Sequence, residues 1–90
     1  MKETLPNFIG KKIVLDTRSS WVYIGQLEEV VGDCVVLSDA DVYDSTQAST
    51  TKERYVMESR LSGVKSNRDR AYVNLDYVVS FSLLDDVKKF

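Results

Sequence analysis

The chain contains no histidine and only one cysteine among its 90 residues. This shortage excludes an internal disulfide and the common metal sites built from histidine and cysteine. Cys34 lies in an apolar run, where an inert buried thiol is far more common than a nucleophile. Acid–base catalysis would fall to carboxylates, lysine or tyrosine, and neither a glycine-rich phosphate loop nor a nucleophile elbow is present. We predict a protein that is not an enzyme and needs no metal or cofactor.

The chain also lacks a long apolar run, a signal-type leader and an excess of positive charge. No apolar stretch approaches the roughly 20 residues of a membrane span, so we expect a soluble, intracellular, cytoplasmic protein. The formal net charge of −2 argues against a generic polyanion binder, because sequence-independent affinity for nucleic acids comes from cations. The length predicts one domain over residues 1–90, with a small core that oligomerisation would supplement.

Charge is unevenly distributed along the sequence. Residues 1–51 hold four Lys/Arg against eight Asp/Glu, residues 52–70 hold six against three, and residues 71–90 hold two against three. We call the six cations of the middle segment the basic island: Lys52, Arg54, Arg60, Lys65, Arg68 and Arg70. Such a segment is either a solvated structural surface or a contact for an anionic partner.

Hydrophobic patterning predicts a mostly β protein. Runs of β-branched and aromatic residues between turn formers predict strands at 12–16, 21–31, 34–43, 71–74 and 78–83. In the last strand, Val79, Phe81 and Leu83 alternate with serines, which is typical of a half-buried strand. Residues 5–10 are expected to form a short turn or helix that packs Phe8 and Ile9 against the end of a barrel.

Gly25 lies inside the second predicted strand. Apolar residues around it, Ile24, Leu27 and Val30, are three positions apart, which strict alternation in a flat strand forbids. Glycine and the slip in phase both indicate a bend or bulge at which the sheet curls over its own core. We therefore predict a small, strongly bent, five-stranded antiparallel barrel.

Residues 44–70 are too many for a simple hairpin loop. Thr50 and Glu53 have the spacing of a helix capping box, and Gly63 can end a helix in a left-handed conformation. The apolar residues in this region recur at helical spacing: Met57, Leu61 and Val64. A long β-hairpin is the alternative, but alternation is poor over residues 54–61, so we favour a helical insert over 50–62 between the third and fourth strands.

The hairpin over residues 23–39 resembles the first signature of the Sm/LSm family, which combines an apolar position, Gly, Leu, a tight turn and a strand ending Leu-x-Asp. The matching positions are Tyr23, Gly25, Leu27, Val30, Leu37 and Asp39. Residues 73–81 are similar to the second signature in their apolar frame, with Asn74 in place of its Arg and Leu75 in place of its Gly.

The resemblance implies an SH3-like barrel whose fourth strand pairs with the fifth strand of the next subunit. The partner is then another copy of the chain, in a homo-oligomeric ring between pentamer and heptamer. Ring closure would also remove the two free edges of an open sheet. The expected interface residues are Tyr72, Val73, Val79 and Phe81.

The family binds uridine- or adenine-rich RNA through the turns inside its two signatures, here residues 32–34 and 74–76. Asn74 lacks the cation and stacking plane of Arg, so we expect binding to shift toward the basic island at Lys65, Arg68 and Arg70. Tyr77, beside the second turn, is the aromatic residue best placed to stack on a base. The predicted nucleic-acid-binding residues are Asp33, Asn74, Asp76, Tyr77, Lys65, Arg68 and Arg70.

Two functions remain open, and a third fits least. The first is a ring that binds single-stranded RNA, or DNA, as a scaffold or chaperone in nucleic-acid processing. The second is a structural or protein-interaction module built on the same ring, without nucleic acid. The third is an acid-dependent hydrolase using Asp39 and Asp41, but catalytic carboxylates need contrasting environments that an exposed turn does not offer. The first function requires Lys65, Arg68 and Arg70 to converge on one face.

Overall fold

The computed structural model describes residues 1–47 and 50–88. In these residues, short elements connect the strands of a sheet. The strands are β1 (Lys12–Thr17), β2 (Trp21–Val31), β3 (Cys34–Asp44), β4 (Arg68–Asn74) and β5 (Val78–Leu83). The helix α1 (Lys52–Ser62) lies between β3 and β4, and three 3-10 turns are η1 (Leu5–Phe8), η2 (Leu75–Tyr77) and η3 (Leu84–Asp86). No helix in the described ranges is long and apolar enough to cross a membrane.

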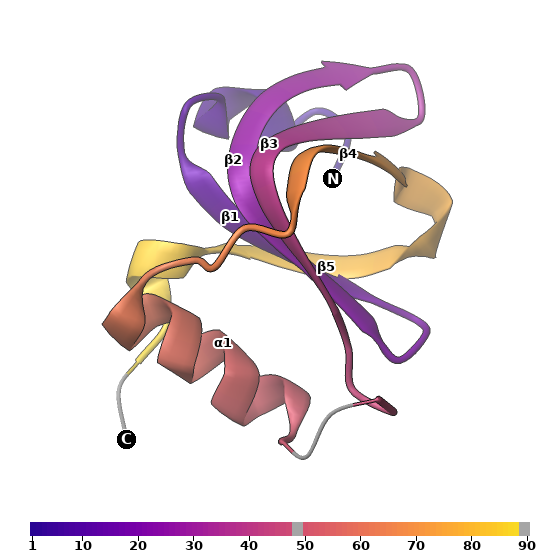
Figure 1. Cartoon of the computed structure of the whole chain (residues 1–90). Helices are drawn as coiled ribbons and strands as arrows, with labels where there is room; N and C mark the ends of the chain where they lie inside the picture. Colours follow the sequence, from indigo (N-terminus) through magenta and orange to yellow (C-terminus); the bar gives the residue numbers. More distant parts are fainter. Residues whose placement is uncertain (48–49, 89–90) are drawn as a thin grey trace.

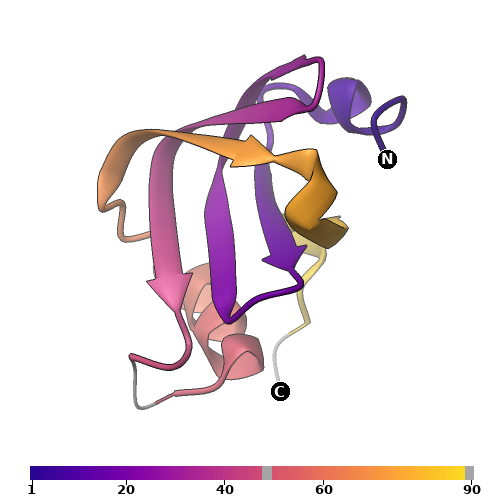
Figure 2. The ribbon, with the colours of Figure 1, turned by 90° about the vertical axis from the view of Figure 1, so that its right-hand side faces the viewer.

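The five strands form one antiparallel sheet in the order β4-β3-β2-β1-β5. The sheet is strongly curved, with β4 crossing in front of β1 and β2 in Figure 2. The predicted fold class is therefore confirmed, and β2 and β5 have the predicted bounds. β4 is the strand that differs most, since it begins at Arg68 rather than at residue 71. β4 and β5 are the two outer strands, so each has one edge unpaired within the chain.

Gly25 lies at the bend, as predicted. The register between β2 and β3 shifts at this point. Ile24 pairs with Asp41 whereas Gln26 pairs with Ser38, so β3 has one extra residue here. That bulge contains Asp39, whose φ of 46° is unusual for a residue with a side chain. A second shift follows between Leu27 and Glu29, and it accounts for the further three-residue step to Val30.

The concave face of the sheet encloses the larger of two hydrophobic clusters. Strand residues such as Leu15, Leu27 and Leu37 are fully buried there. The N-terminal segment covers this cluster. Leu5 is fully buried and Phe8 is partly buried, whereas Ile9 is exposed. The prediction was right about Phe8 and wrong about Ile9, because the chain turns outward after η1.

Helix α1 covers the opposite, convex face (Figure 1). Tyr55 from the helix packs with Val14, Val22, Ile24 and Leu84 in a second cluster. The predicted helix is thus confirmed over the alternative hairpin. Its apolar positions were predicted only in part: Val64, just after the helix, is partly buried against this cluster, whereas Leu61 is exposed and the buried helical positions are Tyr55 and Ser59. The capping residue also differs, since the Thr51 hydroxyl, not that of Thr50, accepts a hydrogen bond from the Arg54 N–H at 3.2 Å.

β5 does not follow the predicted alternation at its start. Thr17 pairs with Val78 and Asp16 pairs with Ser80, so Val79 is an extra residue in a bulge. Val78 is buried, whereas Val79 is 53% exposed. Phe81 keeps its predicted place and contacts Phe8, with their ring centroids 5.7 Å apart.

Candidate functional site

The β2–β3 turn and the β4–β5 turn lie side by side. The Leu75 N–H donates to the Asp33 carbonyl at 2.8 Å, and Asn74 pairs with Cys34 across the strands. The Asn74 side-chain oxygen accepts from the Asp76 N–H at 2.9 Å and so caps η2. The fold therefore joins three of the predicted binding residues, Asp33, Asn74 and Asp76, at one place.

Asp33 is already engaged by another residue. Its carboxylate pairs with the Lys2 ammonium at 3.0 Å, and both side chains are largely exposed. The hydrogen bond and the charge of Asp33 raise the pKa of Lys2. An exposed pair of this kind contributes little to stability, but it offsets one negative charge at the joined turns.

Arg18 brings a cation to the β4–β5 turn, and the sequence reasoning missed it. Its guanidinium donates to the Asp76 carbonyl and lies 5.5 Å from the centre of the Tyr77 ring. Its backbone N–H donates to the Tyr77 carbonyl at 2.9 Å. Arg18 reaches this turn because β1 pairs with β5, which brings the turn after β1 to the start of β5. Arg18 thus contacts Asp76 and Tyr77, in the turn that begins at Asn74.

A pocket of about 290 Å³ opens next to these residues. We call it the aromatic pocket; it is lined by Thr17, Ser19, Trp21, Tyr23, Tyr72, Val73, Asn74 and Tyr77. Three of its rings are well exposed, with Trp21 at 38%, Tyr72 at 68% and Tyr77 at 58%. Exposed rings gathered around one hollow are suited to stacking on a flat ligand or packing against an apolar side chain.

The predicted cations Lys65, Arg68 and Arg70 lie elsewhere. Lys65 follows α1 and lines a separate hollow with Asp41, while Arg68 begins β4. Arg68 and Asn74 are at opposite ends of β4, which spans about 20 Å at roughly 3.3 Å per residue. The structure therefore separates the predicted binding residues into a turn group and a basic group.

The predicted interface residues divide between surface and core. Tyr72 and Val79 are exposed on the two outer strands. Val73 is buried in the concave cluster, and Phe81 is partly buried beside it. An interface along these edges would therefore use Tyr72 and Val79 directly, with Val73 and Phe81 beneath them.

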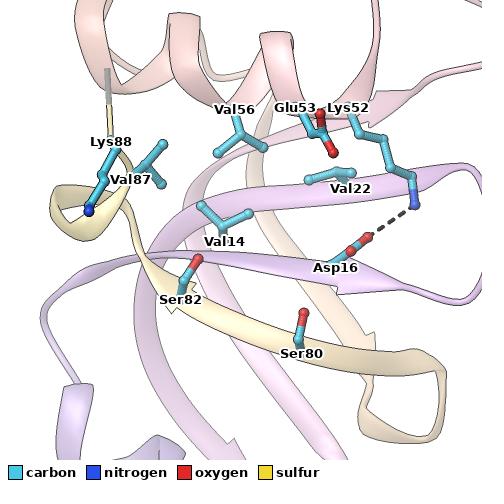
Figure 3. Close-up of a pocket in the computed structure, with 10 residues that line it drawn as sticks. All are labelled: Val14, Asp16, Val22, Lys52, Glu53, Val56, Ser80, Ser82, Val87 and Lys88. Carbon is cyan, nitrogen blue, oxygen red and sulfur yellow. Dashed lines mark hydrogen bonds and ion pairs between the residues drawn. The ribbon is translucent and has the colours of Figure 1, made fainter. Parts of the chain in front are cut away.

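A groove of about 290 Å³ lies between α1 and the convex face (Figure 3). Val14 and Val22 form its apolar floor on the sheet, Val56 of α1 faces them, and the hydroxyls of Ser80 and Ser82 line the groove from β5. At one end, the Lys52 ammonium pairs with Asp16 at 3.0 Å and also donates to the carbonyls of Thr17 and Ser19. These contacts tie α1 to the β1–β2 turn, so this member of the basic island is structural.

The acidic residues at the end of β3 are likewise structural. Asp41 accepts a hydrogen bond from the Tyr55 hydroxyl at 2.6 Å, and burial together with this bond raises the pKa of Tyr55. The Tyr55 ring stacks on Tyr43 with centroids 3.9 Å apart. Asp44 accepts from the Ser20 hydroxyl and from Thr46, which lowers its pKa. Asp41 and Asp44 thus bind side chains of their own chain.

Comparison with known proteins identifies the fold. No family model matches the chain, and no curated protein matches it. Solved structures do match over most of its length. An Sm protein of Pyrococcus abyssii in complex with a uridine heptamer has a TM-score of 0.61 at 16% identity, covering 90% of this chain and 93% of its own.

Two further structures extend the comparison. The SmAP1 heptamer of P. aerophilum has a TM-score of 0.59 at 20% identity, covering 92% of this chain and 90% of its own. A chain of the NatC complex bound to CoA has a TM-score of 0.58 at 15% identity, covering 89% and 83%. The chain therefore has an Sm-like fold, as the hairpin signature predicted.

Proposed function

We propose that this chain is the subunit of a homo-oligomeric Sm-like ring that binds single-stranded RNA and acts as a scaffold or chaperone. The strand order supports the ring, because β4 and β5 each have an unpaired edge that a neighbouring copy can pair with. The similar SmAP1 protein is a heptamer, and the Pyrococcus Sm protein is in complex with a uridine heptamer.

The observation that carries the RNA proposal is the convergence of Arg18, Asn74 and Tyr77 at the joined turns. Tyr77 offers an exposed ring for stacking, at about 1 to 3 kcal/mol per base. The Asn74 oxygen is used within the turn, which leaves its amide N–H groups to donate to a base. Arg18 supplies the charge for a phosphate. Together they provide the stacking, hydrogen-bonding and ionic contacts that single-stranded RNA requires.

Fluorescence anisotropy with a labelled uridine- or adenine-rich strand tests this proposal. Arg18→Gln should weaken binding and reduce the dependence of log affinity on log salt by about 0.7, because one fewer counterion is released. Asn74→Ala should weaken binding without changing the slope. Arg54→Gln is the matched control, since Arg54 lies on α1 at the convex face. The same strand as DNA tests whether the site distinguishes the two.

The basic group gives a competing location for RNA on the same ring. Replacing Lys65, Arg68 and Arg70 by Ala should leave binding nearly unchanged if the turn group is the site. A larger loss of affinity and slope than Arg18→Gln causes would place RNA on the basic group instead. Absence of wild-type binding at low salt would reject RNA altogether.

The second candidate function is a protein-assembly module without RNA. Two observations favour it: a chain of similar fold belongs to the NatC complex, and carboxylates outnumber cations in this sequence, giving a net charge of −2. A ring that forms normally but binds neither RNA nor DNA at low salt would support this function over the first.

A further inference from the structure

The groove between α1 and the convex face has two chemically different ends (Figure 3). Glu53 and the ion pair of Lys52 with Asp16 lie at one end, and Val87 and Lys88 lie at the other. The groove shares no lining residue with the aromatic pocket. A ligand that it holds is therefore separate from the proposed RNA site.

Each end of the groove carries one unbalanced charge. Lys52 is neutralised by Asp16 at 3.0 Å and also donates to two backbone carbonyls, so Glu53 leaves its end of the groove negative. Lys88 makes the other end positive, because it forms no ion pair within residues 1–47 and 50–88. A ligand with one negative group is therefore attracted to the Lys88 end and repelled from the Glu53 end.

Between these ends, the groove is apolar except along β5. Valine side chains from β1, β2 and α1 line its middle. From β5, the hydroxyls of Ser80 and Ser82 point into the groove and make no hydrogen bond in the part of the chain that is described. Ser82 pairs with Val14 and is the serine nearer to Lys88. An ammonium and a free hydroxyl donor thus serve the same end of an apolar groove.

We propose that this groove binds a short aliphatic carboxylate. The carboxylate accepts hydrogen bonds from the Lys88 ammonium and the Ser82 hydroxyl, and the alkyl chain lies over the valines toward Glu53. Val14 and Asp16 of β1 lie toward the two ends and are about 7 Å apart at roughly 3.3 Å per residue, which suits a chain of about four to six carbons. The groove volume of about 290 Å³ accommodates a ligand of this size.

The same charges argue against two related classes of ligand. An aliphatic amine placed at Glu53 would lie beside the Lys52 ammonium, whereas a carboxylate at Lys88 meets no carboxylate among the residues that line that end. A dicarboxylate would bring its second negative charge to Glu53. The ligand is therefore a monocarboxylate.

Valine-methyl NMR of the full chain, titrated with sodium hexanoate, tests the site. The methyl signals of Val14, Val22, Val56 and Val87 should shift together with one dissociation constant, while those of the exposed Val31, outside the groove, should not move. Hexanamide, which has the same chain without the charge, should bind about twofold to fivefold more weakly, the range expected for an exposed ion pair. The absence of a saturable shift in the groove valines, or equal affinity for hexanamide, would overturn the proposal.

Charge variants locate the carboxylate within the groove. Lys88→Gln should lower the affinity for hexanoate about twofold to fivefold and leave that for hexanamide unchanged. Glu53→Gln should raise the affinity for hexanoate, because a repulsive charge is removed. The matched control is Lys11→Gln, at an exposed lysine outside the groove, which should change neither affinity.

Three further outcomes would overturn the proposal. Unchanged hexanoate binding in Lys88→Gln, or an equal loss in Lys11→Gln, would show that Lys88 does not hold the carboxylate. Tighter binding of an acetylated tripeptide that ends in valine than of hexanoate would assign the groove to the carboxyl terminus of a protein partner instead of a free acid.

Discussion

Gly25 is the residue on which the curvature of the sheet depends. A Cβ atom there would lie 3.0 Å from the Ser38 carbonyl oxygen and 3.1 Å from the Ala40 Cα, both parts of the backbone. Gly25→Ala should therefore lower the free energy of unfolding by about 1 to 3 kcal/mol, as overpacking of a filled site does. Urea denaturation measures this change in the free energy of unfolding. Gly32→Asn is the control, because Gly32 has open space and a φ of 57° that Asn tolerates; equal losses in both variants would contradict this role.

Asp44 should make stability depend on acid. Hydrogen bonds from Ser20 and Thr46 lower its pKa from the ordinary value of 3.8. The folded state therefore binds this proton less readily than the unfolded chain does, and the stabilisation is present above pH 3.8 and is lost as pH falls through the folded pKa. Asp44→Asn should flatten the loss of melting temperature between neutral and strongly acidic pH. An unchanged loss of melting temperature at acidic pH in Asp44→Asn would disprove the assignment.

At the scale of single residues, the sequence predicted the bend at Gly25 but not the ionic partners. Gly25 was identifiable because glycine and the slip in phase coincide locally. Arg18 was not, because its importance comes from a contact with residues about 60 positions later that only the pairing of β1 and β5 creates. The same holds for Lys52, which sequence reasoning assigned to a charged surface and the fold assigns to Asp16.

Helix α1 shows what local signals can and cannot specify. Capping and the spacing of apolar residues predicted the element, while its buried face depends on the convex surface of the sheet, which local spacing does not describe. Two adjacent threonines precede the helix, Thr50 and Thr51, and only Thr50 has a glutamate three residues later. Their environments separate them: Thr51 caps the helix, and the buried Thr50 hydroxyl has no hydrogen-bond partner in the described structure.

The two threonines should respond oppositely to substitution. Thr51→Ala removes the cap and should cost about 1 kcal/mol of unfolding free energy. Thr50→Val replaces an unpaired buried hydroxyl with a methyl group and should be neutral or stabilising. Chemical denaturation of both variants decides which threonine caps α1. A loss of unfolding free energy in Thr50→Val with none in Thr51→Ala would show that Thr50 is the cap, as the sequence predicted.

For the whole molecule, the strands and their curvature followed from patterning, whereas the strand order and the proposed binding surface did not. Strands of alternating or β-branched residues can be recognised in isolation, and the bend fixed how they curl. The basic island was continuous in sequence, but α1 and β4 distribute it over the structure, so Lys52 joins the β1–β2 turn and Arg68 begins an outer strand. Cations that are close together in the sequence are therefore separated in the folded chain.

Assembly should be separable from folding at the free edge of β5. Val79→Lys places a charge at an exposed position, so the circular dichroism spectrum of the monomer should be preserved while ring mass is lost, because a buried unpaired charge at the interface is strongly unfavourable. Phe81→Asp should unfold the chain, since Phe81 packs on Phe8 and the concave cluster. Light scattering and circular dichroism measured together distinguish these outcomes, with Gln47→Lys as an exposed control. A folded Val79→Lys protein that still forms rings would show that the outer strands assemble without this residue, and an unfolded one would show that Val79 belongs to the core.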